Sequence, residues 1–348
     1  MNRLRHLQQT LEKNIQDNYL PDEVEFVLLD YNSQDGLDEW ARQNMQQYID
    51  AGILVYYKTY EPEYYLRSHS RNMAFRLANA EILCNLDADN FLGKGFAAFM
   101  IEEFSKQRNI FYTNNYSLND TFGRVCVLTD DFMSIRGYNE ALIGYGYEDT
   151  DFFNRLNSIG LKQIRFDNPE FYRFVLHSDK DRVSEEFMAK NVTKTYITYV
   201  NPYTSGFLLL YKDFTMERYT LIDMKHLSVI ARFSNDNDSV SAERYGITLQ
   251  NTVIKGIWSE EKDTFCFQEN DVKYLASKET SAVNFKGQTF YEVQEQELML
   301  KLFALLSEAI NYKEADKQMK NKSVINPDGF GRGIVCKNFD LSNKIPLP

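Results

Sequence analysis

The chain has 348 residues, of which 43% are hydrophobic and 26% are charged, and its formal net charge is −11. This composition is typical of a globular protein, and the length favours two domains because single cores stop growing at about 250–300 residues. The acidic balance argues against a general binder of nucleic acid or of anionic membranes, although a divalent cation could still mediate contact with a nucleotide.

The cysteines indicate a reducing environment. Cys84, Cys126, Cys266 and Cys336 are widely scattered and form no CxxC pair, which argues against structural zinc and against a disulfide framework. The N-terminus has the pattern of a polar helix and not of a signal peptide, and no apolar run reaches membrane-spanning length. We therefore expect a cytoplasmic protein without a transmembrane segment.

Strands and helices are predicted to alternate through the first half of the chain. Apolar residues at helical spacing predict a helix over 3–16, and residues 24–29 form a buried-type strand that ends at Asp30. A helix over 37–51, a strand over 53–57, a helix over 70–80, a strand from 82 and a helix near 96–104 follow. This order predicts an α/β domain with a mainly parallel sheet and right-handed crossovers.

The sequence ILCNLDADN, residues 82–90, begins as an apolar run and ends in two carboxylates, Asp87 and Asp89. A buried strand would deliver this pair to the edge of the sheet, where ligands of open α/β sheets bind. Carboxylate oxygens suit Mg²⁺ or Mn²⁺, which are commonly shared with substrate phosphates. The alternative is a strand followed by an ordinary acidic turn, which the motif taken alone favours.

A loop rich in glycine and tyrosine, residues 136–147, leads into the sequence EDTD at residues 148–151. An amphipathic helix continues from there, so three carboxylates gather at one helix N-terminus. The helix dipole favours such charge, and acidic first turns are therefore routine. A preceding glycine-rich loop is less routine, because glycine permits close approach of the backbone to a ligand.

Beyond about residue 185 the pattern changes to short strands with polar turns, followed by a strong amphipathic helix around 298–310 and a turn-rich tail over 326–333. We place the domain boundary between Asp181 and Tyr203. The prediction is a domain over 1–185 and a smaller, β-rich accessory α+β domain with a long helix over 186–348. The second domain would serve acceptor recognition or assembly.

Four features occur in order along the first domain: Asp30, the sequence SRNMA at 70–74, the Asp87–Asp89 turn, and the sequence GYGYED at 144–149. Together they resemble the GT-A glycosyltransferases, in particular family 2 and the galactosyltransferase-like group. The resemblance covers about residues 1–180. It implies a Rossmann-like catalytic domain that binds a nucleotide-sugar.

For the donor, the resemblance implies that Asp30 accepts from the uracil ring of a UDP-sugar and that Arg71 lies near the nucleotide. Asp89, with Asp87 assisting, would hold a Mn²⁺ or Mg²⁺ ion that bridges the two phosphates. His177 follows at an interval similar to that of a metal-binding histidine in the galactosyltransferase-like group. A histidine that is merely hydrogen-bonded at a domain edge remains the alternative.

For the chemistry, the resemblance implies that Asp149 is the catalytic base and that Glu148 contacts the acceptor. The other histidines, His6, His69 and His226, are expected to be structural or surface residues. In the families resembled, a β-strand precedes the helix that starts here at Arg3, and the tail over 329–335 is one candidate to fill that central position.

These features imply a metal-dependent, inverting glycosyltransferase that moves a hexose or N-acetylhexosamine from a UDP-sugar to a carbohydrate hydroxyl, in polysaccharide biosynthesis. Two alternatives remain. One is a non-catalytic nucleotide- or carbohydrate-binding protein with the same fold, and the other is a metal-dependent phosphoesterase built around Asp87 and Asp89. We expect a nucleotide-sugar donor and a carbohydrate acceptor as partners and no nucleic acid, and an oligomer is compatible with the sequence.

Overall fold

The computed structural model describes residues 1–114, 121–201, 204–213, 215–223, 247–251, 257–260, 264–269, 272–277, 282–294 and 296–348. The chain forms two compact units, one made of Met1–Ser178 with Glu314–Pro348 and the other of Asp179–Lys313. The second unit is therefore inserted between two parts of the first. The sequence analysis assigned the C-terminal residues to the second domain, whereas in the structure Glu314–Pro348 belong to the first unit.

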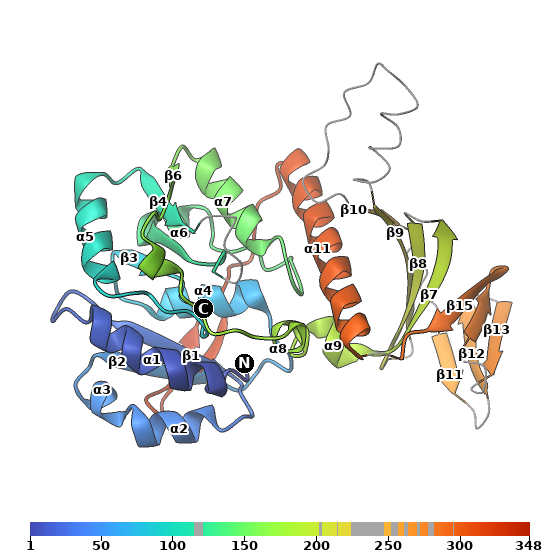
Figure 1. The fold of residues 1–348 in the computed structure, drawn as a ribbon, viewed down its shortest axis with the longest axis horizontal. Helices are drawn as coiled ribbons and strands as arrows, with labels where there is room; N and C mark the ends of the chain where they lie inside the picture. Colours follow the sequence, from blue (N-terminus) through green and yellow to red (C-terminus); the bar gives the residue numbers. More distant parts are fainter. Residues whose placement is uncertain are drawn as a thin grey trace, which may run out of the picture. The chain divides into compact units, whose positions relative to one another are not determined.

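Two four-stranded sheets form the centre of the first unit (Figure 1). One has the order β1 (Phe26–Tyr31), β2 (Leu54–Thr59), β16 (Gly333–Lys337), β17 (Lys344–Leu347), and the other has the order β3 (Ile82–Cys84), β5 (Val125–Leu128), β4 (Ile110–Thr113), β6 (Lys162–Arg165).

The strand pairing in these sheets is mixed. β1 pairs with β2 and β4 with β6 in parallel, and the other pairs are antiparallel. The predicted α/β class is confirmed, but the mainly parallel sheet is not what the described strands form. The antiparallel neighbours come from β5, which pairs with both β3 and β4, and from β16, which pairs with both β2 and β17.

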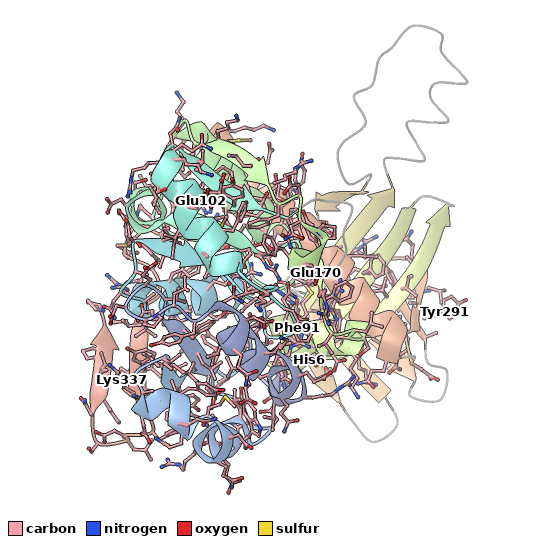
Figure 2. The ribbon with its side chains drawn as sticks, turned by 60° about the vertical axis from the view of Figure 1, so that its left-hand side comes forward. His6, Phe91, Glu102, Glu170, Tyr291 and Lys337 are labelled. Atoms are coloured by element: carbon pink, nitrogen blue, oxygen red, sulfur yellow. The ribbon has the colours of Figure 1, made fainter. Side chains whose placement is uncertain are left out.

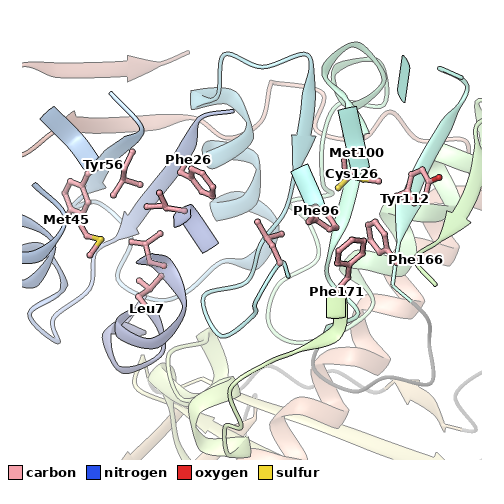
Figure 3. Close-up of a cluster of buried hydrophobic side chains, with 14 of the residues drawn as sticks. Leu7, Phe26, Met45, Tyr56, Phe96, Met100, Tyr112, Cys126, Phe166 and Phe171 are labelled. Atoms are coloured by element: carbon pink, nitrogen blue, oxygen red, sulfur yellow. The ribbon is translucent and has the colours of Figure 1, made fainter. Parts of the chain in front are cut away.

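The helices of the first unit cover both faces of the sheets. They are α1 (Leu4–Asn18), α2 (Leu37–Asn44), α3 (Gln46–Asp50), α4 (Arg67–Leu77), α5 (Phe96–Lys106), α6 (Thr129–Ser134) and α7 (Glu148–Ser158), with a 3-10 turn at Pro169–Tyr172. Successive strand residues point to opposite faces. Accordingly Ile110 and Tyr112 belong to the cluster that includes residues of α1 and α5, in which Figure 3 shows Tyr112 beside Phe166. Phe111 belongs to the cluster of α6 and α7.

The tail strand β16 joins the outer edge of β2, where Cys336 pairs with Lys58. Lys337 lies at the end of this strand (Figure 2). Among the described strands, none pairs with the other edge of β1, and none joins β1 to β3. The expectation that the tail fills the central position between them is therefore wrong, because the tail pairs with β2 instead.

The second unit is rich in β-strands, as predicted, and its described strands pair antiparallel. A six-stranded sheet has the order β10 (Ile247–Asn251), β9 (Met216–Asp223), β8 (Thr204–Tyr211), β7 (Val192–Asn201), β15 (Gln288–Glu292), β14 (Ala282–Phe285). A smaller sheet contains β11 (Ile257–Glu260), β12 (Thr264–Glu269) and β13 (Val272–Ser277), and the helices are α8 (Asp179–Val183), α9 (Phe187–Asn191) and most of α11 (Gln296–Lys320), whose residues from Glu314 onward belong to the first unit. Across the described ranges, no helix combines the length and apolarity that crossing a bilayer requires.

Candidate active site

The acidic turn that follows β3 is fixed by its neighbours. The Asn85 side-chain amide donates to Gly123 O at 2.9 Å and to Asp87 Oδ1 at 3.2 Å. From α1, Thr10 Oγ1 donates to Ala88 O at 2.7 Å. The Asp87 side chain is 35% exposed, whereas the Asp89 side chain is 12% exposed. These hydrogen bonds fix the conformation of the acidic turn.

Asp89 faces His177. The two side chains approach to 3.1 Å between Asp89 Oδ2 and His177 Nε2. The segment that carries His177 is aligned with the turn, since Val175 N donates to Asp89 O at 2.7 Å. Burial opposes ionisation of Asp89, but the hydrogen bond and charge of His177 outweigh it and lower the pKa of that carboxyl. The structure thus brings together two of the predicted metal ligands, with Asp87 two residues away in the chain.

Arg71 connects this turn to the second acidic group. Its guanidinium contacts Asp149 Oδ1 at 2.6 Å, Glu148 Oε1 at 3.5 Å and Asp87 Oδ1 at 3.5 Å. A Cβ added at Gly123 would lie 3.0 Å from Asp87 Oδ2 and 3.2 Å from Asp149 Oδ2, so both carboxylates border the same point. Arg71 is 6% exposed, and although burial opposes its charge, Asp149 and Asp87 raise the pKa of the guanidinium. The two acidic motifs therefore belong to one site.

The loop before α7 turns sharply to present Glu148 and Asp149 in the first helical turn. Tyr147, just before α7, has φ +72° and Gly146 has φ +93°, both in the left-handed region that glycine favours. Burial raises the pKa of Asp149 to about 7, with Arg71 opposing the shift and Glu148 adding to it. Glu148 is 4% exposed, and its Oε2 atom has no hydrogen-bond partner among the described residues. A buried carboxylate with this pKa is suited to take a proton near neutral pH.

Asp30 is placed in a different cluster. It is fully buried, and it accepts hydrogen bonds from Ser33 N and from Tyr56 Oη, each at 2.8 Å. Lys58 Nζ lies 3.3 Å from the same carboxylate, because the parallel register sets Asp30 directly opposite Lys58. Among the described contacts, none links Asp30 to Asp87, Asp89 or Asp149. These partners suit a carboxylate that joins β1 to β2.

We expect Asp30→Asn to lower the free energy of unfolding by about 3 kcal/mol, the range for removing one partner of a buried ion pair. Affinity for UDP should remain unchanged in chemical-denaturation and calorimetry measurements. Asp38→Asn is the matched control, because Asp38 contacts the same Lys58 at 2.9 Å from a side chain that is 46% exposed. A loss of UDP affinity with preserved stability would instead favour a nucleotide contact by Asp30.

Sequence reasoning did not single out Arg124, which is fully buried in this region. Its guanidinium donates to Phe91 O at 2.9 Å and to Asn90 Oδ1 at 3.2 Å, and it also contacts Phe171 O. Burial lowers the pKa of this guanidinium. Arg124 thereby ties the residues after Asp89 to the 3-10 turn. A lone arginine beside a strand carries no signal of such a role.

The remaining histidines fit structural roles where they are described. His6 lies on α1 (Figure 2), is 3% exposed, and its ring sits edge-on to that of His177 at 6.2 Å between centroids. His69 Nδ1 lies 2.7 Å from Tyr31 Oη, and its Nε2 atom lies 2.7 Å from Arg332 O. Because a carbonyl can only accept, Nε2 carries the proton and Nδ1 accepts from the phenol. His226 lies outside the described residues.

Part of the first unit, including the acidic group near Arg71, matches a known family. Residues 109–178 match the family model described as the N-terminal domain of galactosyltransferase. This segment includes the glycine-rich loop, Glu148, Asp149 and His177. The resemblance to galactosyltransferase-like GT-A enzymes is confirmed over these residues.

Two solved structures are similar to part of the chain, and both are of Drosophila β-1,4-galactosyltransferase 7. A mutant in complex with manganese, UDP-galactose and xylobiose shows 14% identity, covers 51% of this chain and 89% of that chain, and has a TM-score of 0.33. The catalytic domain in complex with xylobiose shows 14% identity, with 51% and 90% coverage and a TM-score of 0.32. No curated protein matches the chain.

Proposed function

We propose that the protein is a metal-dependent, inverting glycosyltransferase that transfers a hexose or N-acetylhexosamine from a UDP-sugar to a carbohydrate hydroxyl. The observation that carries this proposal is the placement of Asp87 and Asp149 around Arg71 and Gly123. A transferase needs one group beside the diphosphate and another beside the attacking hydroxyl, and these carboxylates border one point. The family-model match over residues 109–178 supports the same class.

Asp149 is proposed to act as the general base. It lies at the N-terminus of α7 with its pKa raised by burial to about 7, so a substantial fraction is ionised at neutral pH. Glu148 would hold the acceptor, because its Oε2 atom is buried and has no hydrogen-bond partner among the described residues. With a single base on the face opposite the leaving group, displacement would invert the anomeric carbon.

The residues near Asp89 fit a divalent cation. The Asp89 carboxylate and the His177 imidazole face each other, with 3.1 Å between Oδ2 and Nε2, and both kinds of group are ligands that Mn²⁺ accepts. No cluster of three or more His, Cys, Asp or Glu side chains arranged for a metal occurs in the described part of the chain. We therefore propose a partial set, Asp89 and His177 with Asp87 nearby, that diphosphate oxygens and water would complete.

When bound, the cation would stabilise the negative charge that develops on the departing nucleoside diphosphate. The side chains of the protein would bind the donor, keep the acidic groups close together and accept the proton. Asp89 and His177 would hold the donor side, Arg71 would keep Asp87 and Asp149 close together without direct repulsion, and Asp149 would receive the hydroxyl proton. The second unit, Asp179–Lys313, is proposed to serve acceptor recognition or assembly.

Calorimetry with UDP, with and without Mn²⁺, tests the donor site. We expect binding only when the metal is present, because the carboxylates would otherwise repel the diphosphate. A panel of UDP-hexoses and UDP-N-acetylhexosamines, assayed for UDP release, then identifies the donor.

Metal-dependent UDP binding without release of UDP from any donor would favour the non-catalytic binding protein. Absence of metal-dependent binding, together with release of phosphate from simple esters, would favour the phosphoesterase. Magnesium in place of manganese in the same titration distinguishes the two cations.

A further inference from the structure

The C-terminal tail, residues 325–337, crosses the first unit and holds the loop that leads into α7. The Arg136 guanidinium donates to Ile325 O at 2.8 Å and to Asn326 O at 2.6 Å. In return, the Asn326 side-chain amide donates to the carbonyl oxygens of Arg136 and Tyr138, each at 2.8 Å. Residues that are 188 to 190 positions apart in the chain are thus joined by reciprocal hydrogen bonds.

Gly331 brings the same tail against α4. Its amide donates to Glu140 Oε1 at 2.6 Å, and its φ of +57° lies in the left-handed region. A Cβ at this position would meet backbone atoms of Asn72 and Met73 at distances between 2.8 and 3.0 Å. A helix backbone cannot move aside as a flexible side chain can. Glycine is therefore required where the tail and α4 are in direct contact.

Asn72 joins α4 to the loop and is itself fully buried. Tyr138 N donates to Asn72 Oδ1 at 2.7 Å, and Asn72 Nδ2 donates to Tyr138 O at 2.9 Å and to Glu140 Oε1 at 2.8 Å. Glu140 Oε1 therefore accepts from both Asn72 and Gly331. This one oxygen atom of the loop therefore bonds both to α4 and to the tail.

This arrangement determines where Arg71 lies. Arg71 directly precedes Asn72 on α4, and its guanidinium sits 5.3 Å from the centroid of the Tyr138 ring. The Tyr138 ring also packs against α7, since it stacks on the Phe152 ring with 4.0 Å between the ring centroids. From this position Arg71 reaches Asp149 at 2.6 Å. The tail is thus connected to Asp149 through a continuous series of packed and hydrogen-bonded groups.

We propose that the tail is a positioning element for the reaction: Gly331 and Glu140 fix Asn72 and Tyr138, which in turn hold Arg71 beside Asp149. The catalytic part of this inference rests on the proposed function. The tail contacts described above involve the loop and α4, whereas the Asp89–His177 pair is held by α1 and residues 173–175. A loosened tail should therefore impair turnover of bound donor and leave metal-dependent UDP binding intact.

Gly331→Ala in the full chain tests this directly. We expect kcat to fall by about 10-fold to 100-fold, because small displacements of a catalytic group have effects of that size. The Kd of UDP with Mn²⁺ should not change. Glu140→Ala should have the same effect, and Glu140→Gln, which keeps an acceptor oxygen, should restore most of kcat. Gly52→Ala is the matched control, since Gly52 has φ +71° and no atom within 4 Å of an added Cβ.

Hydrogen exchange supplies a second measurement that does not depend on activity. Gly331→Ala is expected to speed exchange of the amides in residues 136–149, and Gly52→Ala to leave them unchanged. Faster exchange confined to the tail, or a Glu140→Gln variant as impaired as Glu140→Ala, would overturn the inference. If the wild type neither binds UDP nor releases it from a donor, the proposed function fails, and the exchange rates alone decide whether the tail positions the loop.

Discussion

Replacing Asp149 by Asn is expected to lower kcat by about 10²–10⁴-fold, the usual contribution of a positioned general base. The amide has nearly the same shape but cannot accept the hydroxyl proton, so metal-dependent UDP binding should persist. Initial rates of UDP release at saturating donor, together with calorimetry, separate the two effects. Asp151→Asn is the matched control, because Asp151 lies in the same helical turn but pairs with Arg155 at 2.8 Å. Equal losses in both variants would contradict the assignment.

The same carboxyl predicts the pH dependence. Because burial raises the pKa of Asp149 to about 7, the ionised base should become more abundant as the pH rises toward and through that value. The rate should therefore increase with pH over this range and level off above it.

The free energy of unfolding should change with pH in the direction opposite to the rate. An acid with a raised native pKa binds more protons in the folded than in the unfolded protein, so stability falls as the pH rises from about 4 to about 7. Asp149→Asn should reduce that dependence in denaturant titrations.

Replacing Asp89 by Asn is expected to weaken Mn²⁺-dependent binding of UDP by about 100-fold or more. Loss of a supporting residue around a metal typically costs 10–100-fold, and loss of a charged ligand should cost at least as much. Calorimetric titration of UDP at fixed Mn²⁺ measures the change. Retention of wild-type affinity in the variant would remove Asp89 from the metal site.

His177→Gln distinguishes the two roles left open for that histidine. Glutamine can still donate a hydrogen bond to Asp89 but lacks the imidazole nitrogen that Mn²⁺ favours. If His177 is a ligand, the variant should bind Mn²⁺ more weakly while its thermal stability stays near that of the wild type. Unchanged Mn²⁺ affinity would identify His177 as a hydrogen-bonding partner alone.

Local patterns in the sequence predicted much of the first unit. The apolar runs before Asp30 and Asp87 are strands, and the acidic group at residues 148–151 begins a helix, because each of these signals depends on neighbours in the chain. The proximity of the two acidic groups could be inferred only from the resemblance. In the structure it depends on Arg71, whose three carboxylate partners lie up to 78 residues away.

The position of Asp30 could not be predicted in the same way. Its partners Tyr56 and Lys58 are set by the register of two parallel strands, which the sequence does not specify. The pairing of the tail with β2 escaped prediction for a related reason. Backbone groups of the tail bond to side chains of distant residues, since Phe330 O accepts from Arg76 and Gly331 N donates to Glu140, and such pairs leave no local pattern in the sequence.

The interrupted order of the first unit has a consequence for biosynthesis. Domains generally fold as units while the ribosome extends the chain from its N-terminus. Here the partner of β2, strand β16, and the glycine that supports α4 are translated only after the whole of Asp179–Lys313. A nascent chain that has just exposed Asp149 therefore lacks the residues that order its surroundings. The first unit can therefore complete its fold only after translation has passed Lys337, although most of its residues emerge much earlier.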